Sequence, residues 1–200
     1  MTKLKFWKTH PVNKLPKKQT AGSACFDLMF QGTGKNTYKG FTRMNKPFER
    51  IMNNQIVVGP GERVMVPTGL IMDIPEGYSV RIHARSGLSL KQGLVLANAE
   101  GVVDSDYVEE VMVLIHNISE NGTTIQNGDR IAQAELVLDV VYDLEESATR
   151  PGIKTSRIGG MGSTGVTSVG DTISITIAKP APAILTEEVK RGRGRPKKNG

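Results

Sequence analysis

Two hundred residues, 38% of them hydrophobic, are enough for one domain with a substantial core and leave some length for appendages. The formal net charge is +6, but six of the 26 basic residues lie in the last eleven positions. The remaining 20 basic residues balance 20 acidic ones, so the positive charge belongs to the C-terminus. Attraction to polyanions is therefore expected at that end and not over the whole surface.

The cysteine content and the N-terminal sequence indicate the cellular compartment in which the protein is expected. A single cysteine, Cys25, excludes an internal disulfide framework and a cysteine-rich zinc site, which suits a reducing cytoplasm. No apolar run approaches membrane-spanning length, and the N-terminal sequence MTKLKFWKTH lacks the pattern of a signal peptide. We therefore expect a cytoplasmic protein with no membrane partner, located in the host cytoplasm if the source is a virus or phage.

The middle of the chain has a pattern that predicts strands. Residues 31–54 are polar and basic, and we interpret them as a long exposed loop or insertion. After them, short runs rich in β-branched residues alternate with turn residues such as glycine, proline and asparagine. These runs are 55–58, 63–67, 78–84, 108–115 and 131–141, with turns at 59–61, 75–77, 121–122 and 127–129. The pattern predicts an all-β sandwich or barrel in a domain over residues 1–149.

Two of the predicted elements have particular features. The run 108–115 is apolar at both alternating sets of positions, so we expect it to be buried on both faces. One short helix is expected to begin near Ser86 or Ser89, with serine as its cap, and to end before Gly93. Its free amides would point at whatever binds beside Arg85.

The C-terminal part changes character. Residues 150–170 are rich in glycine and proline, which predicts a mobile arm. Residues 171–178 contain a clean alternation that predicts one extra strand. Residues 179–200 are interpreted as a linker followed by a disordered basic tail.

Five segments contain the candidate catalytic and ligand-binding residues. In chain order they read AGSACFDL at 21–28, HARSGL at 83–88, GVVDSDY at 101–107, GDRIAQ at 128–133 and RIGGMGSTG at 157–165. In order and composition they resemble the signature motifs of the homotrimeric dUTP pyrophosphatases (dUTPases), and they cover most of residues 20–165. One such segment is a weak signal, whereas five in order are specific.

The resemblance implies both a fold and an activity. The fold is a jelly-roll-like, distorted β-barrel assembled as a homotrimer, with one short helix, a mobile C-terminal arm and three active sites at subunit interfaces. The activity is hydrolysis of dUTP to dUMP and pyrophosphate with Mg²⁺, which lowers dUTP and supplies dUMP for dTMP synthesis. Such chemistry needs a base that activates water, a cation on the polyphosphate and donors that hold it in line.

The phosphate-directed roles follow from the matching motif positions. Asp104, in the third motif, is the candidate base facing the α-phosphorus, on what the sequence suggests is an apolar hairpin. Asp27 would hold Mg²⁺ through water, because Mg²⁺ keeps several waters and takes few protein carboxylates. Arg85 and Ser86 would grip phosphate oxygens with the amides of Gly87 and the helix start. By the same resemblance, Gln133 is a further phosphate donor.

Base and sugar recognition are assigned in the same way. The ring of Tyr107 would pack against the sugar and leave no room for a 2′-hydroxyl, so it selects deoxyribose. Asn98 and the backbone near Gly101 would read the uracil edge. In the fifth motif, a lid from a neighbouring subunit, the groups that would wrap the γ-phosphate or cover the base are Arg157, Met161, Gly162, Ser163 and Thr164.

Some residues depart from the family pattern. Met161 stands where an aromatic residue usually covers the uracil, and a thioether stacks with less defined geometry. Glu100 and Glu109 add negative charge near a site for a polyanion. The tail resembles an AT-hook whose core, Arg193, Gly194, Arg195 and Pro196, would lie in the minor groove of A·T-rich DNA. A plain solubility tail explains the same residues.

Structural interpretations compete with some of these roles. Asp104 could merely cap backbone amides in a turn, and Arg85 could form an ion pair at a subunit interface. We interpret Asp129 and Arg130 as structural, pairing with each other or with interface partners. The three histidines lack ligand spacing, and a solvated or core position is expected for them.

Two other functions stay open at the level of sequence. A dCTP deaminase-like enzyme of the same fold would need a glutamate as proton shuttle, and Glu100 is the nearby candidate. A non-catalytic DNA-binding regulatory protein on a dUTPase scaffold is suggested by Met161, Glu109 and the basic tail.

Overall fold

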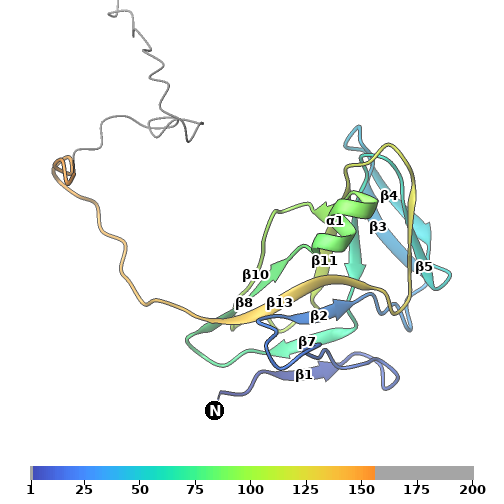
Figure 1. The fold of residues 1–200 in the computed structure, drawn as a ribbon, viewed down its shortest axis with the longest axis horizontal. Helices are drawn as coiled ribbons and strands as arrows, with labels where there is room; N and C mark the ends of the chain where they lie inside the picture. Colours follow the sequence, from blue (N-terminus) through green and yellow to red (C-terminus); the bar gives the residue numbers. More distant parts are fainter. Residues whose placement is uncertain (1, 156–200) are drawn as a thin grey trace, which may run out of the picture. The chain divides into compact units, whose positions relative to one another are not determined.

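A computed structural model describes residues 2–155 of the protein. The part up to Glu145 forms one compact unit with thirteen strands and one helix (Figure 1). Residues 146–155 contain neither helix nor strand. The predicted strand at 171–178, the linker and tail at 179–200, and most of the predicted arm lie outside the described residues, and these predictions stay untested.

The strands pair antiparallel into four sheets. Their bounds are β1 (Lys5–Lys8), β2 (Phe26–Met29), β3 (Thr37–Phe41), β4 (Pro47–Ile51), β5 (Gln55–Val58), β6 (Arg63–Pro67), β7 (Leu70–Asp73), β8 (Tyr78–His83), β9 (Leu94–Leu96), β10 (Gly101–Val103), β11 (Met112–Asn117), β12 (Thr123–Gln126) and β13 (Arg130–Leu138). The two larger sheets have the orders β10-β8-β13-β2 and β4-β3-β6-β11-β9, and the pairs β1-β7 and β12-β5 form the smaller ones. In Figure 1, β13 crosses the body between β8 and β2.

The core lies on the inner faces of these sheets and follows the two-residue period of a strand. In the four-stranded sheet, Val80 and Ile82 of β8 are buried, and in the five-stranded sheet Val64 and Val66 of β6 are. All of them belong to a single hydrophobic cluster. The predicted all-β class with one short helix is confirmed, and the runs 55–58 and 63–67 coincide with β5 and β6.

The predicted run 108–115 differs from the strand observed there. β11 begins only at Met112, and Val108 before it is 70% exposed. Burial alternates along β11, with Val113 buried and Leu114 37% exposed. The expectation of burial on both faces is therefore wrong within one chain, because no other described segment covers the outer face at Leu114.

The interpretation of residues 31–54 as a long exposed loop is also wrong. This insertion forms the hairpin β3-β4, and β3 pairs in turn with β6, so the insertion adds two strands to the five-stranded sheet. Its polar composition hid the alternation, because glycine and arginine occupy inner positions at Gly40 and Arg50. Close packing requires the glycine, since a Cβ at Gly40 would collide with the carbonyl oxygen of Arg63.

Arg50 is tolerated at an inner position because Glu62 neutralises it. The guanidinium donates hydrogen bonds of 2.8 and 2.6 Å to the carboxylate and lies 3.9 Å from the ring centroid of Phe48. The hydrogen bonds from Arg50 hold the pKa of Glu62 below its usual range and raise the pKa of Arg50. Glu62 also accepts a bond from the amide of Gly59, so one carboxylate ties the hairpin to the turn before β6.

The single helix, α1, spans Ser86–Gln92 and ends at Gly93, whose φ of 65° lies in the left-handed region that suits glycine. Its position is confirmed, but the predicted serine cap is wrong. Arg85 occupies the N-cap position without a side-chain cap, and its carbonyl accepts the amides of Leu88 and Ser89. Over the described part of the chain, no helix has the length and apolar character to cross a membrane.

The Arg50–Glu62 pair leads to a prediction about stability. Glu62→Gln should lower the free energy of unfolding by about 2 kcal/mol at neutral pH, less than for a fully buried pair because Arg50 is partly exposed. Because the pKa of Glu62 is lower in the folded than in the unfolded protein, its charge stabilises the fold at any pH above the usual glutamate pKa of about 4.3. This stabilisation is lost as the pH falls through the pKa of Glu62 in the folded protein. The gap between wild type and variant should therefore shrink in acid.

Urea unfolding at one fixed protein concentration, at neutral pH and again in acid, measures this gap. Glu49→Gln is the matched control, because Glu49 lies exposed on the same hairpin. Its loss should stay below about 0.5 kcal/mol. Equal losses for the two variants, or a gap that does not change with pH, would contradict the assignment.

Candidate active site

Four of the five motif segments lie on neighbouring strands of the four-stranded sheet. The first motif ends on β2, the fourth enters β13, the second leaves β8 and the third contains β10. In the register of this sheet Asp27 is opposite Gln133, and Gln133 is opposite His83. Directly opposed residues point to the same face, so the sheet aligns one residue from each of three motifs in a single row.

Asp27 is the centre of a charged cluster on this row. It is largely buried, and each of its carboxylate oxygens contacts a different arginine. Oδ1 is 3.2 Å from Nε of Arg85, and Oδ2 is 3.0 Å from a terminal nitrogen of Arg130. Arg85 also donates to the backbone carbonyl of Arg130 at 2.9 Å. The cluster thereby joins β2, β13 and the start of α1.

Arg85 keeps donors for a ligand although it is ion-paired. A guanidinium has five N–H groups, and the two contacts above use two of them. Ser86 and Gly87 follow at the exposed start of α1. Arg85 therefore forms an ion pair within one chain, which is not the pair at a subunit interface weighed above, and its other N–H groups have no partner among the described residues.

Arg130 is the residue of this cluster that sequence reasoning underestimated. We expected it to be structural and to pair with Asp129 or with an interface partner. Its partner is instead Asp27, 103 positions earlier, while Asp129 accepts the amide of Gln126. Membership of the fourth motif was the only signal in the sequence, because nothing local relates Arg130 to Asp27. A cavity of about 210 Å³ adjoins Arg85 and Arg130.

The oxygens of Asp27 and Gln133 are the groups in this cluster that suit Mg²⁺. Both Asp27 oxygens are engaged by arginines, so this carboxylate fits a metal held through water better than one bound directly. The amide nitrogen of Gln133 donates to the Ala84 carbonyl at 3.0 Å, and among the described residues no hydrogen bond reaches its amide oxygen. These groups suit an indirect site completed by substrate oxygens. Among the described residues, no three acidic, histidine or cysteine side chains form a metal cluster of their own.

Cys25 lies near the cluster but is not activated as a nucleophile. Burial raises the pKa of its thiol, and the negative charge of Glu135 raises it further. A thiol must be deprotonated to attack, so this cysteine has the electrostatic surroundings of an inert one.

The third motif is not a hairpin, contrary to the prediction. β10 pairs with β8 in the four-stranded sheet, whereas the preceding β9 pairs with β11 in the five-stranded sheet. The chain thus passes from one sheet to the other at 97–100, the segment that contains Asn98, and a turn follows β10. In that turn the amide of Tyr107 bonds to the carbonyl of Asp104 at 3.2 Å. Asp104 is exposed, and none of the described residues pairs with its carboxylate.

Glu110, which sequence analysis did not single out, supports this turn. Its carbonyl accepts the Tyr107 hydroxyl at 3.1 Å, and the Tyr107 ring is 41% exposed. The Glu110 carboxylate binds the amide of Gly69 at 2.8 Å and the amine of Lys35 at 2.7 Å. Lys35 belongs to the insertion, so the insertion helps to hold the turn that carries Asp104 and Tyr107.

Within one chain, the third motif and the Asp27 cluster do not meet. β10 and β2 are opposite edges of the sheet, about 14 Å apart at the usual strand spacing. Val103 is opposite Val80 of β8, so Asp104 lies four residues from His83 along the strand direction. At the usual rise per residue this adds a displacement of about 13 Å. The backbone positions of Asp27 and Asp104 are therefore roughly 19 Å apart. Arg157, Met161, Gly162, Ser163 and Thr164 lie outside the described residues.

Solved structures define the class of fold. The dUTPase of Staphylococcus bacteriophage 80alpha with dUpNHpp matches with a TM-score of 0.64 at 21% identity, over 83% of this chain and all of that one. A dUTPase from phage phi11 of S. aureus with a coordinated structural Mg(II) ion matches at 0.59, with 18% identity, over 76% of this chain and all of that one. The dUTPase of Streptococcus mutans matches with a TM-score of 0.53 at 24% identity, over 69% of this chain and 98% of that one. The protein has the dUTPase fold.

Sequence relatives define the family. The dUTPase family model matches residues 50–165. The deoxyuridine 5′-triphosphate nucleotidohydrolase of Brucella abortus (strain 2308) is 42% identical over 152 residues, which are 76% of this chain and 84% of that protein. The counterpart of Caulobacter vibrioides (strain NA1000 / CB15N) is 38% identical over 168 residues, 82% and 94% of the two chains. The chain belongs to the dUTPase family.

The different surroundings of two aspartates can be tested by unfolding. Asp27→Asn should lower the free energy of unfolding by about 3 kcal/mol, because two arginines lose their shared, largely buried carboxylate. Asp104→Asn is the matched change at an exposed carboxylate and should alter it by less than about 0.5 kcal/mol. Urea titrations at fixed protein concentration compare them. Similar losses would show that Asp27 is not the anchor of the cluster.

Proposed function

We propose that this protein is a dUTP diphosphatase that converts dUTP to dUMP and pyrophosphate, lowering dUTP and supplying dUMP for dTMP synthesis. The observation that carries the proposal is the alignment of four motif segments on one sheet, with Asp27 fixed between two arginines. The relatives reported above are named as nucleotidohydrolases of the same substrate. A cytoplasmic location belongs to the same proposal and rests on the sequence.

The reaction is a displacement at the α-phosphorus. A water oxygen bonds to this phosphorus, the bond to the bridging oxygen breaks, and pyrophosphate leaves. Asp104 takes the proton of the water, because its exposed carboxylate has no competing partner among the described residues. The remaining donors of Arg85, with Ser86 and Gly87, hold phosphate oxygens as charge shifts onto them.

Two further sets of groups hold the substrate. Asp27 would hold Mg²⁺ through water, the ion would supply charge neutralisation of the triphosphate, and Gln133 would be a further phosphate donor. Tyr107 packs on the deoxyribose, while Asn98 and Gly101 read the uracil. The lid over the γ-phosphate and base, Arg157, Met161, Gly162, Ser163 and Thr164, and the DNA-binding tail, Arg193 to Pro196, stay predictions.

The catalytic site is completed by a second copy of the chain within a homotrimer. A base and a phosphate-gripping arginine must act on adjacent atoms of one triphosphate, yet Asp104 lies roughly 19 Å from Asp27 in the same chain. Two larger hollows, of about 890 and 800 Å³, lie along the five-stranded sheet and contain none of the predicted site residues. An exposed apolar stretch also favours association, since Val140, Val141 and Leu144 are 80%, 94% and 91% exposed.

The alternative functions have less support. Deamination of dCTP would need Glu100 as a proton shuttle at the base, whereas the relatives reported above are named as hydrolases of dUTP. The non-catalytic alternative rested on Met161, Glu109 and the tail, none of which removes a group that the hydrolysis needs.

The base assignment predicts a separation of binding from turnover. Asp104→Asn should reduce kcat for dUTP by at least about a thousand-fold, because the amide cannot accept the proton. Binding of dUTP with Mg²⁺, measured by calorimetry, should change little. Pyrophosphate release from dUTP, dTTP, dCTP and UTP provides the activity measurement. Retained turnover in the variant would exclude Asp104 as the base, and an inactive wild-type enzyme with Mg²⁺ would exclude the function.

The shared site predicts complementation between two inactive variants. Asp104→Asn and Arg85→Ala chains carrying different tags are co-expressed, and assemblies with both tags are purified. In a cyclic trimer one site in three then combines an intact Arg85 with an intact Asp104, so about a third of wild-type activity should return. Doubly tagged assemblies of Asp104→Asn alone give the background. Activity at background level in the mixed assemblies would mean that each site lies within one chain.

A further inference from the structure

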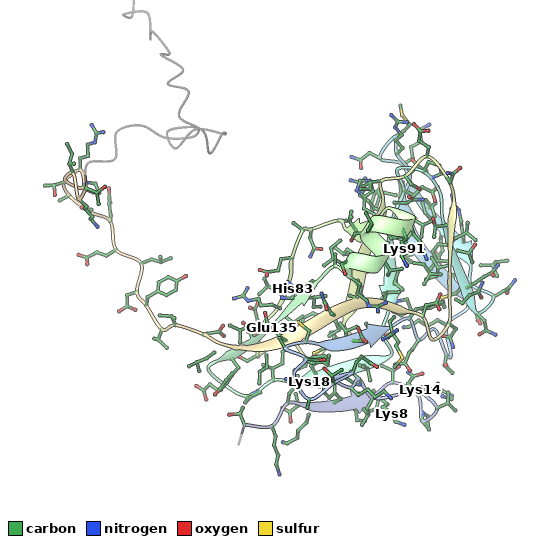
Figure 2. The ribbon with its side chains drawn as sticks, viewed as in Figure 1. Lys8, Lys14, Lys18, His83, Lys91 and Glu135 are labelled. Carbon is green, nitrogen blue, oxygen red and sulfur yellow. The ribbon has the colours of Figure 1, made fainter. Side chains whose placement is uncertain are left out.

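His83 lies between two glutamates from different segments. Its Nε2 is 3.2 Å from the carboxylate of Glu135 on β13, and its Nδ1 is 3.5 Å from the carboxylate of Glu100 just before β10. Figure 2 shows His83 and Glu135 on their neighbouring strands β8 and β13. The three side chains are partly exposed, so His83 is neither a core residue nor a surface residue without partners.

One end of this contact lies on the phosphate-binding strands. His83 is directly opposite Gln133 in the register of β8 and β13, and the next residue, Ala84, accepts the Gln133 amide. Arg85 follows at the start of α1. The imidazole therefore projects from the strands that carry Gln133 and lead into Arg85.

The other end lies on the turn 97–100, which precedes Gly101. Within it the amide of Glu100 bonds to the carbonyl of Asn98 at 2.7 Å, and Ala99 has a φ of 60°. A residue with a side chain rarely adopts this left-handed conformation, so the turn needs support from its surroundings. Among the described residues, Glu100 makes the only polar side-chain contact from this turn, and that contact is with His83.

We propose that His83 is a positioning residue for base selection. It holds Glu100, and with it the turn that carries Asn98, against the phosphate-binding strands β8 and β13. The proposal rests on the proposed function, because it concerns how the same enzyme distinguishes uracil from other bases. His83 itself contacts neither base nor phosphate in this scheme.

The two ring nitrogens of the imidazole let His83 contact both glutamates at once. The other charged groups beside it are Arg81, the register partner of Glu135, and Arg85, which is turned to Asp27. Arg81 contacts Asp139 at 3.9 Å and does not replace His83 at Glu100.

The test compares selectivity for dUTP over dCTP, measured as the ratio of their kcat/KM values. His83→Ala should raise KM for dUTP about five-fold, leave kcat within about two-fold and lower the selectivity, because one hydrogen-bonded link is lost. His83→Gln can still donate to one glutamate, so it should recover part of the selectivity that His83→Ala loses.

Two Glu→Gln variants separate the link from a general effect of charge. Glu100→Gln should weaken selectivity as His83→Ala does. Glu109→Gln removes an acidic charge from the same region, but Glu109 is exposed and makes no polar contact within the described residues. If Glu109→Gln lowers selectivity as much as Glu100→Gln, the effect is one of charge and the proposal is overturned.

Hydrogen–deuterium exchange provides a readout that does not need turnover. In the free protein, amides of the peptide spanning 97–103 should exchange faster in His83→Ala and Glu100→Gln than in wild type, and at the wild-type rate in Glu109→Gln. Unchanged exchange in His83→Ala, in an enzyme that hydrolyses dUTP, would overturn the role of His83 and leave the function intact. A wild type inactive on dUTP would overturn the function, and faster exchange would then support the link alone.

Discussion

One carboxylate shared by two arginines holds the candidate site together. Asp27 is largely buried, and it can stay charged there because Arg85 and Arg130 each take one of its oxygens. The same contacts place the start of α1 beside the first residue of β13, since Arg85 is the N-cap of the helix. The donors that we propose for phosphate thus lie at a helix start that the cluster ties to β13, so less ordering would be needed when an anion binds.

The sheet that organises this cluster also separates it from Asp104, the proposed catalytic base. Asp27 lies on one edge strand and Asp104 follows the other, with β13 and β8 between them. Each chain would then contribute its phosphate-binding cluster to one site and its third motif to another. His83 occupies the intervening strands and contacts the turn before β10, so it lies where ordering at one site can affect its neighbour.

Sequence predicted what is local and missed what depends on distant pairing. The strands β5 and β6, the position of α1 and the family could be predicted because alternation, a glycine stop and motif order are all short-range patterns. The insertion was misjudged because its inner Arg50 becomes acceptable only when Glu62 pairs with it. The partner of Arg130, and the division of β9 and β10 between two sheets, depend on long-range register that no local pattern encodes.

Two acidic residues beside the third motif, Glu100 and Glu109, depart from the family pattern. Extra negative charge beside a polyanion is unfavourable unless a cation offsets it or it stays in solvent. In the structure Glu109 is exposed and Glu100 lies beside His83, while the neighbouring Glu110 pairs with Lys35 of the insertion. The Lys35 contact gives the insertion a physical role, because it ties the hairpin segment to the turn of Asp104 and Tyr107. Changes in the insertion and changes in the third motif are therefore coupled through one ion pair, and neither can be understood from its own segment alone.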